Sequence, residues 1–95
     1  MRKSFIFKRI GGNAVYTFHL MSKNNDIGVW KREDKELWCK LILNFGWSIV
    51  DEFENRLGWP EKSEVTEYPP EGIWISKKDN KSYRYELIFL DIRGK

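Results

Sequence analysis

Apolar side chains that recur at every second position on both sides of a glycine pair most strongly constrain the fold of this chain. The alternation runs through residues 4–10 and 14–21, and Gly11-Gly12 lie between them. Period-two alternation is typical of a strand with one buried face, and glycine supplies the positive φ of a tight hairpin turn. The predicted cross-strand pairs are Phe7 with Tyr16 and Phe5 with Phe18. Because both pairs are aromatic and share a face, the hairpin and its register support each other.

A second hairpin is expected between residues 27 and 44. Ile27 to Lys31 is a short apolar strand that follows the turn-forming cluster Ser22 to Asp26. Residues 36–44 alternate as a strand does, but the same leucines also fit the spacing of a helix. We favour the strand, with the charged segment Arg32 to Lys35 as its turn, and keep the helix as the alternative.

One helix is predicted over residues 48–57. Ser48 resembles an N-cap, Asp51 stands at the third helical position, and Gly58 follows as a stop signal. Within the segment Phe53 lies on an apolar stripe, with acidic residues on the opposite face. We expect Trp47 and Trp59 to pack the two ends of this helix against the sheet.

The last third of the chain predicts a long loop and a final hairpin. The segment from Trp59-Pro60 to Gly72 is interrupted by prolines and is expected to be an ordered loop. Ile73 to Ile75 then leads through a polar turn into a long strand, Tyr83 to Ile92. With Asp79-Asn80 as the turn, the facing pairs are Trp74 with Tyr85, Ser76 with Tyr83 and Lys78 with Lys81.

Together these elements predict an α+β fold of order ββββαββ, with about six antiparallel strands and one main helix on one face of the sheet. The 95 residues suffice for a single compact domain, residues 1–95. No apolar run approaches the length of a membrane span, and Lys8 and Arg9 interrupt the N-terminal apolar run before it resembles a secretory signal. With a single cysteine, Cys39, we expect a cytoplasmic protein.

Charge is distributed unevenly along the chain. Residues 1–50 carry a net charge of +5 and residues 51–71 one of −5, within a total of +3. This predicts an acidic side and a basic side, a pattern that orients a charged partner.

Catalytic groups are scarce. His19 is the only histidine and is expected to be partly exposed on a strand with no serine or cysteine beside it, and Cys39 is expected in the core. Gly11-Gly12 lack the lysine and helix of a phosphate-binding loop. We therefore expect a protein that is not an enzyme and that carries no catalytic residues, no cofactor and no metal.

Five tryptophans in a chain with a mean hydropathy of −0.61 suggest that some indole faces a partner. Three of them lie beside basic residues on predicted strands, and the final hairpin adds further aromatic and basic side chains. The candidate binding residues are Trp30, Lys31, Arg32, Trp38, Lys40, Trp74, Lys78, Lys81, Tyr83 and Tyr85. The same pattern also fits a core face with lysines at its wet end, so the sequence leaves open which tryptophans are exposed.

These features favour a small binding module, regulatory or inhibitory, that docks on a protein partner through aromatic and basic residues. The alternative is single-stranded nucleic-acid binding on an aromatic and basic sheet face. No membrane partner is expected, and the oligomeric state stays open.

Overall fold

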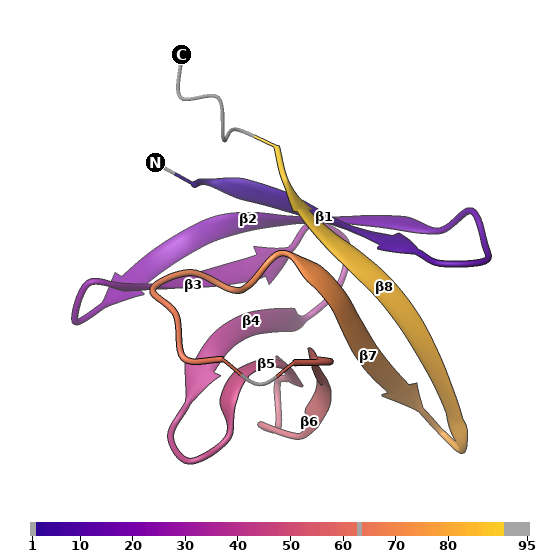
Figure 1. Cartoon of the computed structure of the whole chain (residues 1–95). Coiled ribbons are helices and arrows are strands. Elements are labelled where there is room, and N and C mark those ends of the chain that lie inside the picture. The colour runs from indigo at the N-terminus through magenta and orange to yellow at the C-terminus, as the bar shows by residue number, and fades with distance from the viewer. Residues whose placement is uncertain (1, 63, 91–95) are drawn as a thin grey trace.

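The computed structural model describes residues 2–62 and 64–90, and within them the chain forms eight antiparallel strands (Figure 1). Each strand pairs with its neighbours in the sequence, and β1 also pairs with β8, so the sheet closes into a barrel. The strands are β1 (Ser4–Arg9), β2 (Val15–Asn24), β3 (Ile27–Arg32), β4 (Leu37–Ile42), β5 (Gly46–Asp51), β6 (Arg56–Pro60), β7 (Gly72–Lys78) and β8 (Lys81–Phe89).

The predicted α+β fold is wrong, because the described residues contain no helix and the structure is all-β. Residues 48–57 form the end of β5, a turn and the first two residues of β6, and Phe53 is 76% exposed instead of packing on a sheet. Asp51 is not at the start of a helix; its Oδ1 accepts hydrogen bonds from the backbone N–H groups of Phe53 and Asn55 across the turn. The polar residues that resemble a helix cap thus stabilise a hairpin turn. This replaces one helix by two strands and raises the strand number from about six to eight.

The predicted hairpins are confirmed, and so are the registers predicted for the first and the last of them. Phe5 pairs with Phe18 and Phe7 with Tyr16 in β1–β2, as the aromatic pairs indicated. Residues 37–42 are a strand, which settles the open alternative for that segment. In β7–β8 the three predicted pairs are present, and Ile92, the predicted end of the last strand, lies outside the described residues.

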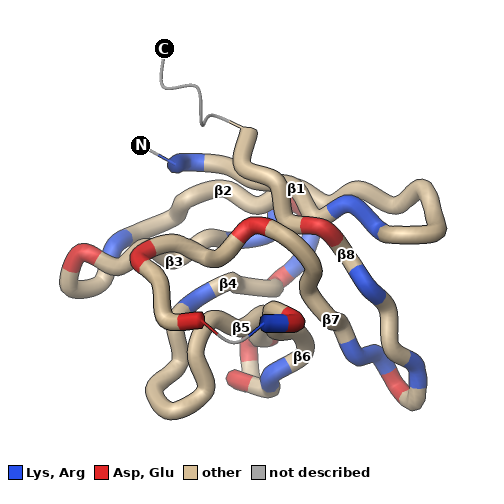
Figure 2. The backbone as a smooth tube through the Cα atoms, in the orientation of Figure 1, with Lys and Arg blue, Asp and Glu red and all other residues tan. Residues whose placement is uncertain are grey.

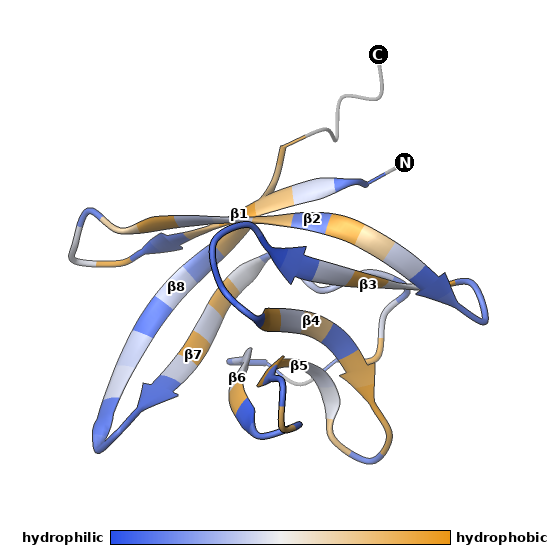
Figure 3. Cartoon of the chain, turned by 180° about the vertical axis from the view of Figure 1, so that it is seen from behind, coloured by the Kyte–Doolittle hydropathy of each residue, from blue (hydrophilic) through white to orange (hydrophobic). Residues whose placement is uncertain are grey.

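Aromatic side chains fill the barrel interior. Alternate residues of each strand point inward, and the resulting core cluster is Phe5, Phe7, Phe18, Trp30, Cys39, Trp47, Ile49, Trp74, Tyr85, Leu87 and Phe89. Residues of higher and lower hydropathy alternate along β4 and β7 when the barrel is seen from behind (Figure 3). Phe5 contacts Phe18 in a stacked geometry at 4.8 Å and Phe89 edge-on at 5.4 Å between ring centroids. A barrel of this strand number has an interior that side chains can fill.

One end of the barrel is covered by residues 64–71, which we call the strap and which belong to the predicted long loop (Figure 1). Trp47 Nε1 donates to the carbonyl of Thr66, and Trp74 Nε1 donates to that of Pro70, both at 2.9 Å. Tyr68 of the strap packs edge-on against core rings. Two of the five tryptophans therefore fasten the strap. Trp47 is in the core instead of at a helix end, and Trp59 is half-buried on β6.

The other end of the barrel lies at the β1–β2, β3–β4, β5–β6 and β7–β8 turns, and we call it the mouth. The acidic segment 51–71 does not form one side of the molecule. Its residues divide between the β5–β6 turn at the mouth and the loop that follows β6, and acidic and basic residues are interspersed along the backbone (Figure 2). A helix able to cross a membrane is also absent from the part of the chain that the structure describes.

Candidate functional site

A cleft of about 430 Å³ opens at the mouth of the barrel. We call its apolar lining residues Leu37, Ile49 and Leu57 the base, because Ile49 belongs to the core cluster and Leu37 packs against it. Aromatic and cationic side chains also line the cleft. The lining residues are Arg9, Tyr16, Arg32, Lys35, Leu37, Ile49, Leu57, Ser76, Lys77, Lys78, Asp79, Tyr83 and Tyr85. Clefts of this size at the mouth of a β-barrel are common places for ligands to bind.

Two arginines reach the cleft because the inward alternation of their strands continues past the core. Arg9 follows Phe5 and Phe7 at a spacing of two residues on β1, and Arg32 follows Trp30 on β3. A strand that ends at the mouth thus carries its last inward side chain at the edge of the interior. Alternation in the sequence could have placed Arg9 at the site, although it was not among the predicted residues.

Each of these arginines lies on a tyrosine ring. The guanidinium carbon of Arg32 is 3.6 Å from the ring centroid of Tyr16, and that of Arg9 is 4.1 Å from the ring centroid of Tyr83. Such stacking holds the planar guanidinium group in place and leaves the N–H groups at its edge able to donate hydrogen bonds.

Arg32 is also bound to a carboxylate. Its Nε lies 2.6 Å from Asp34 Oδ1 and its Nη2 lies 3.3 Å from Asp34 Oδ2. The hydrogen bond from Arg32 lowers the pKa of Asp34, so this carboxylate is ionised at neutral pH. The mouth therefore contains one complete arginine–carboxylate pair.

Tyr85 lines the cleft and also belongs to the core cluster. Its ring stacks on Phe7 at 5.6 Å and lies 5.9 Å from the ring of Tyr16. Burial, followed by the effect of Tyr16, raises the pKa of the Tyr85 hydroxyl, which stays neutral and able to donate a hydrogen bond.

The cleft carries an excess of positive charge. Its cationic lining residues are Arg9, Arg32, Lys35, Lys77 and Lys78. One lining residue, Asp79, is acidic, and Asp34 binds Arg32 from the adjoining turn. The cleft thus combines donors for an anion with an apolar base.

The structure brings together four of the predicted binding residues and separates the others. Arg32, Lys78, Tyr83 and Tyr85 line the cleft, and Lys81 stands beside it, opposite Lys78 in the register. Among the aromatic and cationic lining residues, those that the sequence did not single out for this site are Arg9, Tyr16, Lys35 and Lys77.

The remaining predicted residues lie in the core or on the outer face. Trp30 and Trp74 are 1% and 0% exposed, so the alternative of a core face holds for them. Lys31 lies over Trp38 on the outside of β3–β4, 5.8 Å from its ring centroid, and Lys40 pairs with Glu54 at 2.9 Å. These outer contacts are separate from the cleft.

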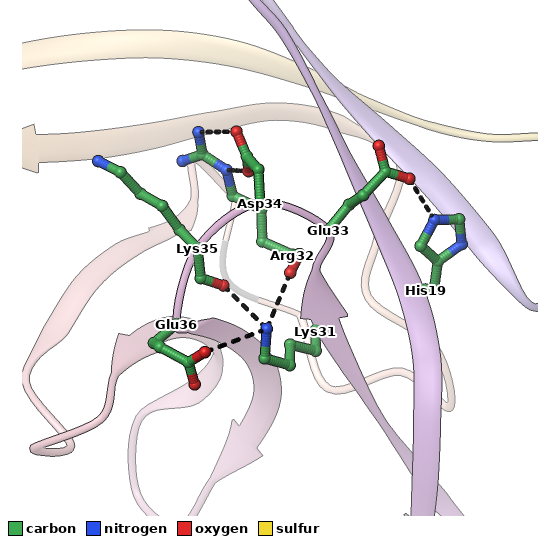
Figure 4. A network of polar contacts seen from close by, with 7 residues as sticks. All are labelled: His19, Lys31, Arg32, Glu33, Asp34, Lys35 and Glu36. Carbon is green, nitrogen blue, oxygen red and sulfur yellow. Dashed lines mark hydrogen bonds and ion pairs between the residues drawn. The ribbon is translucent and has the colours of Figure 1, made fainter.

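A serine, a histidine and a glutamate lie in hydrogen-bond contact on the outside of the barrel. His19 Nδ1 is 2.9 Å from Ser4 Oγ, and His19 Nε2 is 2.7 Å from Glu33 Oε1 (Figure 4 shows the second contact). The expectation that no serine lies beside His19 is therefore wrong. Acyl transfer also needs a cleft and oxyanion donors, whereas the side chains of His19 and Glu33 are 52% and 62% exposed. The contact joins the β3–β4 turn to β2.

Within residues 2–62 and 64–90, no group of three or more His, Cys, Asp and Glu side chains is placed to hold a metal ion. No protein-family model, curated protein or solved structure matches this chain.

Proposed function

We propose that this protein is a non-enzymatic binding module that docks an acidic segment of a protein partner at the barrel mouth. The observation that carries the proposal is the cleft itself, in which five cationic side chains and one carboxylate surround an apolar base. Charge complementarity orients such a partner, and buried apolar and aromatic contacts supply affinity. A module of this kind acts by occupying its partner, which corresponds to a regulatory or inhibitory role.

The arrangement of the rings favours a protein over single-stranded nucleic acid. Bases stack on free aromatic faces, but Trp30 and Trp74 are inside the barrel, and Tyr16 and Tyr83 each have a guanidinium group on one face. A nucleic-acid strand carries a negative charge at every phosphate, whereas an acidic peptide segment can carry one or two charges among apolar residues, so the acidic turns around the mouth oppose a strand leaving the cleft more strongly than such a segment. These turns contain Glu33, Asp34, Glu36, Glu52 and Glu54. Nucleic acid is therefore an outcome to test and not our proposal.

An array of short acidic peptides, followed by fluorescence anisotropy on the best binders, tests this function. The variant Lys35→Gln/Lys78→Gln removes two exposed charges at the cleft, whereas Lys23→Gln/Lys62→Gln removes the same charge elsewhere. We expect the first variant to lose about 1–1.4 kcal/mol of binding free energy, roughly five- to tenfold in affinity. The second should bind nearly as the wild type does.

Two results would overturn the proposal. The first is an equal loss of affinity in both double variants, which would show that binding follows net charge and not the cleft. The second is tighter binding of oligothymidine than of any peptide, with an affinity that falls steeply as salt is added.

A further inference from the structure

The mouth contains two arginine–tyrosine stacks, and they differ in one respect. Arg32 on Tyr16 binds Asp34 through two nitrogen–oxygen contacts, and Figure 4 shows this pair beside the other contacts of the β3–β4 turn. Within residues 2–62 and 64–90, no carboxylate lies within ion-pair distance of the Arg9 guanidinium.

The Tyr83 ring and the backbone of the β1–β2 turn hold the Arg9 side chain in position. Its guanidinium lies 4.1 Å from the Tyr83 centroid, and a side chain added at Gly12 would meet Arg9 Cδ at 3.2 Å. The aliphatic part of the Arg9 side chain therefore packs against the backbone of the β1–β2 turn at Gly12, and its guanidinium group lies on the Tyr83 ring of β8. A guanidinium group held in this way loses little conformational freedom when it binds a ligand.

We propose that Arg9 binds the carboxylate of an aspartate or glutamate in the partner segment, in the manner in which Arg32 binds Asp34. This proposal rests on the proposed function and names the group that the mouth recognises. Arg–carboxylate pairs are planar and bidentate, and they are among the stronger hydrogen-bonded contacts in proteins. Lys78 adds positive charge on the same cleft wall.

The base of the cleft defines what stands next to the acid. Leu37, Ile49 and Leu57 line the cleft together with Tyr85, which is 8% exposed. An apolar side chain adjacent to the acidic residue removes this surface from water while the carboxylate stays at Arg9. The recognised element is thus an acidic residue beside a large apolar residue.

Three matched peptides test the inference on the full chain by NMR. Each is acetylated and amidated, with a central residue flanked by leucines: glutamate in the first, glutamine in the second and phosphoserine in the third. We expect the glutamate peptide to shift the Arg9 Nε–Hε signal, and the glutamine peptide to bind at least roughly tenfold more weakly, because the charge-assisted contact is lost. Tighter binding of the phosphoserine peptide than of the glutamate peptide would overturn the choice of a carboxylate.

Variants of Arg9 separate the effect of the planar guanidinium group from the effect of its positive charge. Arg9→Gln removes both, Arg9→Lys keeps the charge, and Lys8→Gln removes one charge from the exposed neighbouring position on β1. We expect R9Q and R9K each to lose most of the affinity for the glutamate peptide, and K8Q to lose less than about twofold. Full affinity in R9K would refute bidentate binding. If R9Q does not fold, the Arg9 signal in the wild-type protein decides the question.

The outcomes distinguish this inference from the proposed function. If the glutamate peptide shifts signals of Leu37 and Ile49 but not that of Arg9, the mouth is a binding site and the role of Arg9 is wrong. If no peptide shifts any signal at the mouth, the proposed function fails together with the inference.

Discussion

Replacing the three interior tryptophans by phenylalanine, one at a time, separates the burial of the indole ring from its hydrogen bond. Trp30, Trp47 and Trp74 are each at most 1% exposed. Nε1 of Trp74 donates to Pro70, and Nε1 of Trp47 donates to Thr66. Among the described residues, Nε1 of Trp30 is the buried side-chain polar atom without a hydrogen-bond partner.

The hydrogen bonding of each indole N–H determines how much the free energy of unfolding should change in each variant. Each substitution removes a similar apolar area, so the area and cavity terms are similar in the three variants. Trp74→Phe additionally loses a hydrogen bond, about 1 kcal/mol net, while Trp30→Phe removes an unpaired buried donor whose burial costs about 1–3 kcal/mol. The free energy of unfolding of W74F should therefore lie at least about 2 kcal/mol below that of W30F. W47F should fall between them, because Thr66 is an exposed residue and water can reach its carbonyl group.

Urea unfolding followed by far-ultraviolet circular dichroism measures these free energies, with similar slopes required of all three variants. For a domain of this size a difference of about 2 kcal/mol corresponds to about 8–16 °C in Tm. W30F losing as much stability as W74F would refute the reasoning, because the hydrogen bonds to the strap would then contribute nothing measurable.

Three further outcomes are expected. Gly28→Ala should cost about 1–3 kcal/mol in urea unfolding, because its Cβ would lie 2.6 Å from Trp30 Cη2 inside a packed core; unchanged stability would contradict that packing. Hydrogen bonds from Asn55 hold the pKa of Asp51 below its ordinary value of 3.8. The stability they contribute is present above that value and is lost as the pH falls through the lowered folded-state pKa, so Asp51→Asn should flatten the acid limb of the stability profile. An acid limb as steep in D51N as in the wild type would exclude this role. Burial raises the pKa of the Cys39 thiol, so we expect the thiol to react with a disulfide reagent only when the protein unfolds. Rapid labelling of the native protein would disprove this burial.

The hairpins could be predicted because their information is local. In β1–β2 the aromatic pairs Phe5–Phe18 and Phe7–Tyr16 share one face, and a shift by one residue would turn both pairs outward. The same argument gives the register of β7–β8.

The helix was predicted wrongly because its signals were also local. Ser48 and Asp51 have the spacing of a cap, yet Trp47 and Ile49 alternate and both point into the core. Tertiary packing overrides a cap worth about 1 kcal/mol when a large indole is buried in exchange. Ser48 meanwhile accepts a hydrogen bond from Arg56 across β5–β6, at 2.6 Å.

The candidate site was predicted in part for a related reason. Basic and aromatic residues of the final hairpin could be grouped from its register, and Lys78, Tyr83 and Tyr85 do lie together. The sequence could not show that Trp74 of the same face is interior, because its depth depends on the strands opposite it.

Alternation along each strand by itself determined which side chains share a face, since successive residues of a strand point to opposite sides whatever the sheet becomes. Only the tertiary structure decided that this sheet closes. The pairing of β1 with β8 places Arg9 opposite Tyr85, although 76 positions separate them in the chain. Closure turns one sheet face into an interior with two ends, so the same alternation that buries Phe5 and Phe7 presents Arg9 at the mouth.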